Sequence, residues 1–144
     1  MADDVKPLGC VILADAHHSV LESVHGLLDS MFATVVMVTD QESLMETAKA
    51  MSPEMVVLDL SLPRSISGNV IKRVVQEVPG VRILALTMDD DPKVIKQVLA
   101  SGALAVLVKA TAGTDLIPAI EQVHAGNRYV SPSVPIKIDP TNET

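Results

Sequence analysis

Four residues with polar side chains close apolar runs of the sequence, and their types suit chemistry on a phosphoryl group. The four are Asp15, Asp59, Thr87 and Lys109. Carboxylate oxygens, together with a backbone carbonyl and water, are the ligands that Mg²⁺ prefers. A phosphoryl group held beside that ion uses a lysine ammonium and a hydroxyl against its oxygens. Each residue taken singly also fits a loop or a helix cap, so the candidate site depends on all four lying together.

The apolar runs have the length of buried strands, and segments with helical spacing of apolar residues alternate with them. The expected strands are Cys10–Ala14, Thr34–Val38, Met55–Leu60, Val81–Leu86 and Ala103–Val108. The expected helices cover residues 19–31, 39–51, 70–78, 91–101 and 114–125. Three of them open on patterns typical of an N-cap: Ser19, Thr39 with Glu42 as a capping box, and Asp91 followed by Pro92.

Five strands that alternate with five helices predict an α/β fold. Right-handed crossovers between successive strands give a doubly wound, five-stranded parallel sheet with helices on both faces. A hydrophobic fraction of 48% with only 1% aromatic residues fits this class, because its core is built from aliphatic side chains. The carboxyl ends of parallel strands share one edge of the sheet, so Asp15, Asp59, Thr87 and Lys109 are expected to converge there.

The charge and the cysteine content exclude several kinds of site and partner. A formal net charge of −7, with 11 Lys and Arg residues scattered along the chain, argues against direct nucleic-acid binding by this segment. Cys10 is the only cysteine, so neither an internal disulfide nor a thiolate zinc site can form. The acidic start and the lack of any apolar run of about 20 residues argue against a signal peptide and a membrane span. We therefore expect a cytoplasmic protein.

A length of 144 residues suits one domain with a substantial core. We expect residues 1–8 to form an N-terminal tail and residues 9–130 to form the folded domain. Ser131, Pro132, Pro135 and Pro140 lie in a polar stretch that is poor in helix formers. Residues 131–144 are therefore expected to be a linker or a C-terminal tail.

The order and local context of these residues resemble a bacterial two-component response-regulator receiver domain, which has a flavodoxin-like topology, over residues 9–130. The resemblance rests on five segments: Ile12–Asp15, Val57–Pro63, Leu86–Thr87, Gly102–Ala103 and Leu107–Lys109. In addition, Ala125–Pro132 resembles the junction that follows the receiver in regulators with a LuxR-type helix-turn-helix output domain. The 144 residues themselves contain no segment that resembles that output domain.

The resemblance implies that Asp59 accepts a phosphoryl group from the phosphohistidine of a sensor histidine kinase. It implies a Mg²⁺ cofactor held by Asp15, Asp59 and the backbone carbonyl of Ser61, with Asp15 acting at most through water. Lys109 would hold the phosphorylated carboxylate, and Thr87 would move toward the phosphoryl oxygen. A shift of the surface around the fourth and fifth strands would then control a partner or a homodimer and, through it, an output such as transcription.

Three features depart from the usual receiver pattern. Ala16 stands where a second acid normally ligates the metal, and its lack of charge weakens the attraction for Mg²⁺. His17 and His18 are poor substitutes, because neutral imidazole is a poor magnesium ligand. Val106 replaces the aromatic switch residue three positions before the lysine, and the loop that follows Asp59 is one residue longer than usual. A degenerate receiver that binds partners or dimerises without phosphorylation therefore stays open as an alternative.

Two other classes with this architecture fit the sequence less well. A phosphatase with an aspartyl nucleophile uses a second acid two positions later, whereas Asp59 is followed by Leu60 and Ser61. A nucleotide- or flavin-binding module would show a glycine-rich phosphate loop, and the sequence has neither G-x-G-x-x-G nor a P-loop lysine pattern. We therefore expect a signalling domain and not an enzyme.

Overall fold

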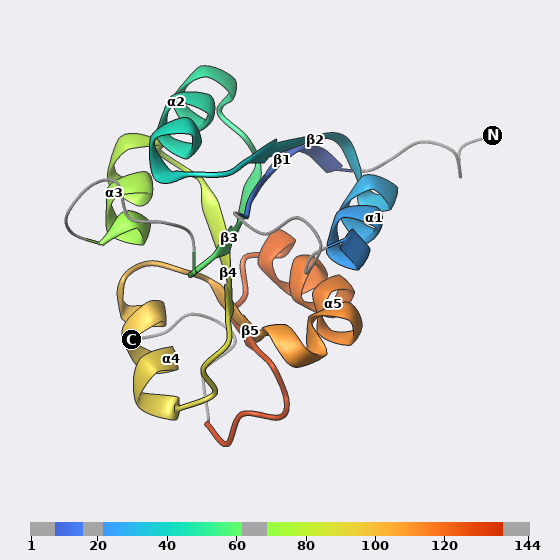
Figure 1. Ribbon diagram of the computed structural model, residues 1–144, viewed down its shortest axis with the longest axis vertical. Coiled ribbons are helices and arrows are strands. Elements are labelled where there is room, and N and C mark those ends of the chain that lie inside the picture. The colour runs from blue at the N-terminus through green and yellow to red at the C-terminus, as the bar shows by residue number, and fades with distance from the viewer. Residues whose placement is uncertain (1–7, 16–21, 62–68, 137–144) are drawn as a thin grey trace.

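The computed structural model describes residues 8–15, 22–61 and 69–136, and it is built on a parallel sheet of six strands (Figure 1). The strands are β1 (Leu8–Ala14), β2 (Phe32–Val38), β3 (Met55–Asp59), β4 (Arg82–Thr87), β5 (Ala105–Val108) and β6 (Tyr129–Val130). Their order, β2-β1-β3-β4-β5-β6 with every pair parallel, confirms the predicted doubly wound α/β fold. The two-residue β6 adds to the five predicted strands, because the chain turns at Gly126 and returns along β5.

Five α-helices cover the two faces of the sheet. They are α1 (Glu22–Met31), α2 (Gln41–Met51), α3 (Val70–Glu77), α4 (Pro92–Ala100) and α5 (Ala112–His124). Val24 of α1 and Leu116 of α5 belong to one buried cluster, whereas Leu44 of α2 and Ile71 of α3 belong to another. Ile95 of α4 packs in a third cluster beside β5. None of these helices, which lie in the described ranges, is long and apolar enough to cross a bilayer.

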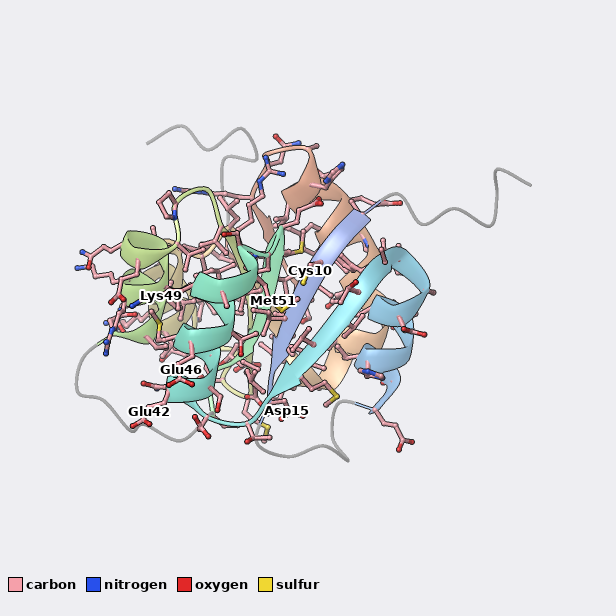
Figure 2. All side chains as sticks on the ribbon, turned by 90° about the horizontal axis from the view of Figure 1, so that it is seen from above. Cys10, Asp15, Glu42, Glu46, Lys49 and Met51 are labelled. Atoms are coloured by element: carbon pink, nitrogen blue, oxygen red, sulfur yellow. The ribbon has the colours of Figure 1, made fainter. Side chains whose placement is uncertain are left out.

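The first turn of α2 differs from its expected form. Asp40, not Thr39, is the N-cap, and its Oδ1 accepts a hydrogen bond of 2.8 Å from the backbone N–H of Ser43. The predicted capping box of Thr39 and Glu42 is therefore wrong by one residue, because the helix begins at Gln41 and the cap must reach an N–H in its first turn. Figure 2 shows the exposed Glu42 on the outer side of this helix.

The predicted start of α4 is confirmed, whereas that of α5 is wrong by two residues. Asp91 caps α4 through a 2.9 Å hydrogen bond from the backbone N–H of Lys93, and Pro92 lies in the first turn as predicted. α5 begins before the predicted Thr114, because a turn of 3-10 helix over Lys109–Thr111 leads directly into it. The expected cap Ser19 lies outside the described residues.

The chain packs against the domain at both ends of the predicted domain range. Leu8, expected in the N-terminal tail, is buried as the first residue of β1. Ser131 and Val134, expected in the linker, are also buried, and Ile136 is half-buried. Part of the proline-containing stretch therefore lies against the sheet and α4. Residues 1–7 and 137–144 lie outside the described ranges.

Gly102 connects α4 to β5 in a backbone conformation that side chains rarely adopt. Its φ is 121°, and an added Cβ would lie 3.1 Å from Cγ2 of Val75. We therefore expect Gly102→Ala to lower the free energy of unfolding by about 1–3 kcal/mol, measured by urea denaturation. Gly26→Ala is the matched control, because a Cβ at that α1 position meets no atom within 4 Å. The control is expected to raise stability by about 0.5–1 kcal/mol, and equal effects of both variants would contradict this account.

Candidate functional site

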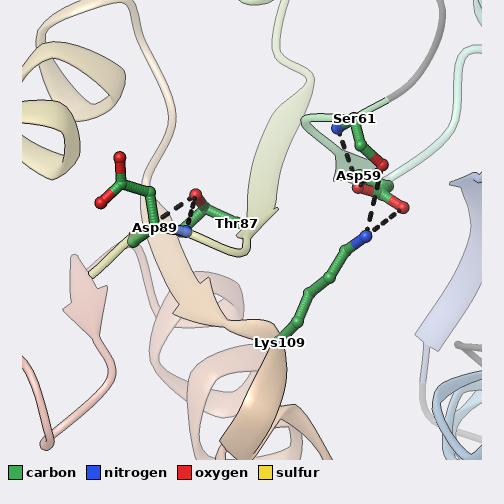
Figure 3. Close-up of polar contacts among 5 residues, drawn as sticks. All are labelled: Asp59, Ser61, Thr87, Asp89 and Lys109. Carbon is green, nitrogen blue, oxygen red and sulfur yellow. Dashed lines mark hydrogen bonds and ion pairs between the residues drawn. The ribbon is translucent and has the colours of Figure 1, made fainter. Parts of the chain in front are cut away.

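Asp59 ends β3, the strand that lies between β1 and β4 in the sheet. Its side chain is fully buried. The chain turns directly after it, and this turn brings both hydrogen-bond donors of Ser61 to one carboxylate oxygen. The backbone N–H of Ser61 lies 2.9 Å and its hydroxyl 2.8 Å from Oδ1 of Asp59 (Figure 3). The carboxylate is therefore held in one orientation at the carboxyl edge of the sheet.

Lys109 directly follows β5 and reaches back to the same carboxylate. Its Nζ lies 2.8 Å from Oδ2 of Asp59 and donates a 3.3 Å hydrogen bond to the Ser61 hydroxyl (Figure 3). The lysine side chain is 8% exposed and the aspartate side chain 0%, so this ion pair is buried. Burial raises the pKa of Asp59, but Lys109, Ser61 and a hydrogen bond with Asp15 outweigh it and hold that pKa below its usual value. Asp59 is therefore ionised at neutral pH.

Asp15 places a second carboxyl group beside the first. It follows β1 directly and is fully buried, and its backbone N–H donates to the carbonyl of Val38 at 2.9 Å. Its carboxyl group is close enough to that of Asp59 to help lower the pKa of Asp59. Figure 2 shows Asp15 at the end of β1. The structure thus brings together the two predicted metal-binding carboxyl groups, Ser61 and the predicted lysine.

The donor set around Asp59 fits a small, hard cation. Two buried carboxyl groups in contact repel each other when both are ionised, and a divalent ion relieves this repulsion. The described ranges contain no group of three or more His, Cys, Asp or Glu side chains arranged around a metal. One or two carboxylates with water and carbonyl oxygens are nevertheless typical of Mg²⁺, which keeps several of its waters. Ala16, His17 and His18 lie outside the described residues, so the predictions made for them are untested.

Thr87 lies on the same edge but turns away from Asp59. It ends β4 and is almost fully buried. Its Oγ1 accepts a 3.0 Å hydrogen bond from the backbone N–H of Asp89 and donates one of 3.3 Å to the backbone carbonyl of that residue (Figure 3). The side chains of Asp15, Asp59 and Lys109 therefore lie together. The fourth predicted side chain, Thr87, is held by the loop that precedes α4.

A cavity of about 500 Å³ gives access to this edge of the sheet. Asp59 and Thr87 both line it, together with residues of α3 and α4 such as Val70 and Val94. Gln41, at the start of α2, also faces it. Asp59 therefore lies in the wall of a cavity at the carboxyl edge of the sheet.

The Ser61 hydroxyl makes a contribution to the site that was not predicted from the sequence. Ser61 was expected to act only through its backbone carbonyl, whereas its hydroxyl bridges Asp59 and Lys109. A hydroxyl two residues after a strand-ending acid is a signal for such a turn, because Ser side chains commonly bond to nearby groups. Val106, at the expected switch position, is fully buried in the cluster that β5 shares with α4.

Comparison with known proteins gives a consistent set of matches. A family model described as response regulator receiver domain matches residues 11–121. The chain is 27% identical over 126 residues to the transcriptional regulatory protein DegU of Brevibacillus brevis, covering 86% of this chain and 53% of that protein. It is 29% identical over 127 residues to the oxygen regulatory protein NreC of Staphylococcus carnosus, covering 86% and 58%. The chain thus spans little more than half the length of these two relatives.

Solved structures agree with these matches. A LuxR-family two-component response regulator from Aurantimonas sp. SI85-9A1 superposes with a TM-score of 0.78 at 27% identity, over 87% of this chain and 91% of that chain. The isolated receiver domain of RcsB from Salmonella enterica serovar Typhimurium, in its apo form, gives a TM-score of 0.76 at 27% identity, over 87% and 94%.

Proposed function

Since this chain belongs to the response regulator receiver domain family of two-component signal transduction, we propose that it accepts a phosphoryl group on Asp59 from a sensor histidine kinase. The observation that carries this proposal is the buried Asp59 carboxylate, fixed by Ser61 and paired with Lys109 at 2.8 Å. A carboxylate held in this way is ionised and presents a defined oxygen to a donor that enters the adjoining cavity. Because DegU is a transcriptional regulatory protein, we also propose transcription as the output of the whole protein.

The proposed transfer moves one phosphoryl group between two nucleophiles. An oxygen of Asp59 attacks phosphorus in line as the phosphorus–nitrogen bond of phosphohistidine breaks, and the histidine keeps the bonding electron pair. Lys109 offsets the negative charge that gathers on the transferred group and afterwards holds the acyl phosphate. Thr87 exchanges its hydrogen bonds with Asp89 for one to a phosphoryl oxygen. The 2.8 Å distance between Lys109 and Asp59 and the hydrogen bond that now holds Thr87 support these roles.

Mg²⁺ supplies positive charge against the phosphoryl oxygens when it is bound. We propose that Asp15, Asp59 and the backbone carbonyl of Ser61 hold it, with Asp15 acting through water. The two carboxyl groups in contact support this assignment, because they present oxygens in a buried position that favours a cation. We further propose residues 9–130 as the receiver and the following stretch as the connection to the output.

Two substitutions on neighbouring residues are expected to change magnesium affinity in opposite directions. Asp15→Asn should weaken Mg²⁺ binding by about 10–100-fold, the usual effect of losing an outer ligand partner. Ala16→Asp should strengthen it, because it adds a carboxylate where the family has one. Isothermal titration calorimetry with MgCl₂ measures the Mg²⁺ affinity of both variants. Asp90→Asn, which removes a nearby exposed acid, is the control and should leave that affinity unchanged. An unchanged Mg²⁺ titration for Ala16→Asp would show that position 16 is not the one that matches the metal-ligating acid of the family.

Treatment of the purified chain with acetyl phosphate tests the proposed function. We expect intact mass spectrometry to show one added phosphoryl group in the presence of Mg²⁺ and none after chelation with EDTA. No adduct at any magnesium concentration would contradict the proposal and would favour a receiver that acts without phosphorylation.

A further inference from the structure

Val134 and Ile136 of the segment 131–136 pack on an apolar surface formed by α4 and β5, which we call the groove. Val134 is 5% exposed and packs in one cluster with Ile95 and Leu99 of α4 and with Val106 and Val108 of β5. Ile136 is half-buried against the same cluster. This cluster is separate from the two larger ones that join the sheet to the other helices. The segment therefore fills space beside the small side chain at position 106.

Ser131 fastens the start of this segment through a buried polar network. It is 1% exposed, and its Oγ accepts a 3.0 Å hydrogen bond from the backbone N–H of Val108. The same hydroxyl donates to Oδ2 of Asp115 in α5 at 2.7 Å, and Thr111 donates to that oxygen at 2.6 Å. The backbone N–H of Ser131 donates to the carbonyl of Val106 at 3.1 Å. Buried networks with every donor used are costly to open, so this contact fixes the segment to the end of β5.

The contacts of residues 131–136 lead by two routes to the residues around Asp59. On one side, Ser131 holds the N–H of Val108, the residue directly before Lys109. On the other side, Val134 packs on α4, which is capped by Asp91. The backbone N–H of Asp91 donates a 2.9 Å hydrogen bond to Oδ1 of Asp89. Asp89 is the residue that holds the Thr87 hydroxyl. A movement of either Lys109 or Thr87 therefore reaches the walls of the groove.

We propose that residues 131–136 form an intramolecular clasp that stabilises the unphosphorylated arrangement of β5 and α4 and is loosened when Asp59 is phosphorylated. This inference rests on the proposed function. Once Thr87 turns toward a phosphoryl oxygen, Asp89 loses its partner and the start of α4 is free to shift, which removes part of the wall that covers Val134. Coupling is reciprocal, so a weakened clasp favours the phosphorylated state. The clasp thus links the phosphoacceptor to the chain that leaves the domain.

Hydrogen exchange of the segment tests the proposed response. The amides of Val134 and Ile136 donate within the segment, at 3.0 Å to the carbonyl of Ser131 and at 2.8 Å to that of Val134. We expect their exchange to become about tenfold faster when Mg²⁺ and the phosphomimetic beryllofluoride are added, within the usual range of coupling between sites. Fluorine NMR establishes whether beryllofluoride is bound. Unchanged exchange in a sample that has bound it would overturn the clasp.

Two neighbouring serines give a matched pair of variants. Ser131→Ala removes the buried hydroxyl, whereas Ser133→Ala changes an exposed residue of the same segment. We expect only Ser131→Ala to speed the exchange of Val134 and to tighten the binding of beryllofluoride several-fold. A beryllofluoride affinity that is the same for both variants would overturn the coupling, even if Ser131→Ala loosens the segment.

A third measurement needs no phosphoryl group. Thr87→Ala removes the hydrogen bonds to Asp89, so it should speed the exchange of Val134 and Ile136 relative to amides of β2. Thr87→Ser keeps the hydroxyl and should leave this exchange close to that of the wild type. If Thr87→Ala has no effect, the clasp is overturned. If it has the expected effect while beryllofluoride fails to bind, the link from Thr87 to residues 131–136 stands and the proposed role of Asp59 is contradicted.

Discussion

Asp59→Asn is expected to abolish the phosphoryl adduct that forms with acetyl phosphate and Mg²⁺. The amide has nearly the shape of the carboxylate, but it carries no negative charge and is a poor nucleophile, so transfer to this position stops. Intact mass spectrometry of the wild type and the variant, treated side by side, measures the effect. Asp90→Asn, which changes an exposed acid on the same edge, should keep the full adduct. An equal adduct in Asp59→Asn would show that another residue is modified.

Lys109→Met is expected to lower the free energy of unfolding by about 3–5 kcal/mol at neutral pH, because it leaves the Asp59 carboxylate buried without its counter-charge. Methionine keeps most of the apolar stem of lysine, so the effect reports the lost ammonium. In the wild type, burial raises the pKa of Asp59 and Lys109 is the first of the groups that lower it, so removing the ammonium leaves burial opposed only by Ser61 and Asp15. Urea denaturation measures the change.

A double-mutant cycle separates the ion pair from other effects of Lys109→Met. The double variant Lys109→Met with Asp59→Asn should lose less free energy of unfolding than the sum of the two single variants. We expect the difference to be about 0.5–3 kcal/mol, because no uncompensated charge is left. Lys49→Met breaks the pair of Lys49 with Glu77, which is partly exposed, and should have a much smaller effect. A similar cost for Lys49→Met and Lys109→Met would contradict a buried pair at the site.

Five of the six strands could be predicted from the sequence because the core of this domain is simple. β3 is buried along its whole length, so Met55–Leu58 is an uninterrupted apolar run and Asp59 stands out at its end. The same pattern marks β1 and β4, and it places Asp15 and Thr87 at the edge where Asp59 lies. A parallel sheet then brings these positions together without any further signal.

The side-chain contacts of the site depend on the three-dimensional structure. Sequence spacing carries no information on the direction of the Thr87 hydroxyl, which the loop at Asp89 decides. The bridging role of the Ser61 hydroxyl likewise depends on where Lys109 arrives from β5, 48 residues later in the chain. Strand ends could thus be assigned, but hydrogen-bond partners could not.

The packing of residues 131–136 was not expected because their composition indicates a linker. Proline and serine dominate the stretch from Ser131 to Pro135, and local propensity favours a loop there. Two residues override this propensity in the structure: Ser131 completes a buried network with Asp115, and Val134 fills the groove beside Val106. The local sequence pattern predicts neither contact, because each joins residues that are 16 or more positions apart in the chain.

Chemical trapping of the phosphorylated residue tests the central claim most directly. Borohydride converts an aspartyl phosphate to homoserine, so peptide mapping of the wild-type chain after treatment with acetyl phosphate, Mg²⁺ and borohydride locates the modified position. We predict homoserine at position 59 alone. Homoserine at position 15 or in the acidic loop 89–91, or none in a sample that carries the phosphoryl mass, would contradict the assignment of Asp59 as the phosphoacceptor.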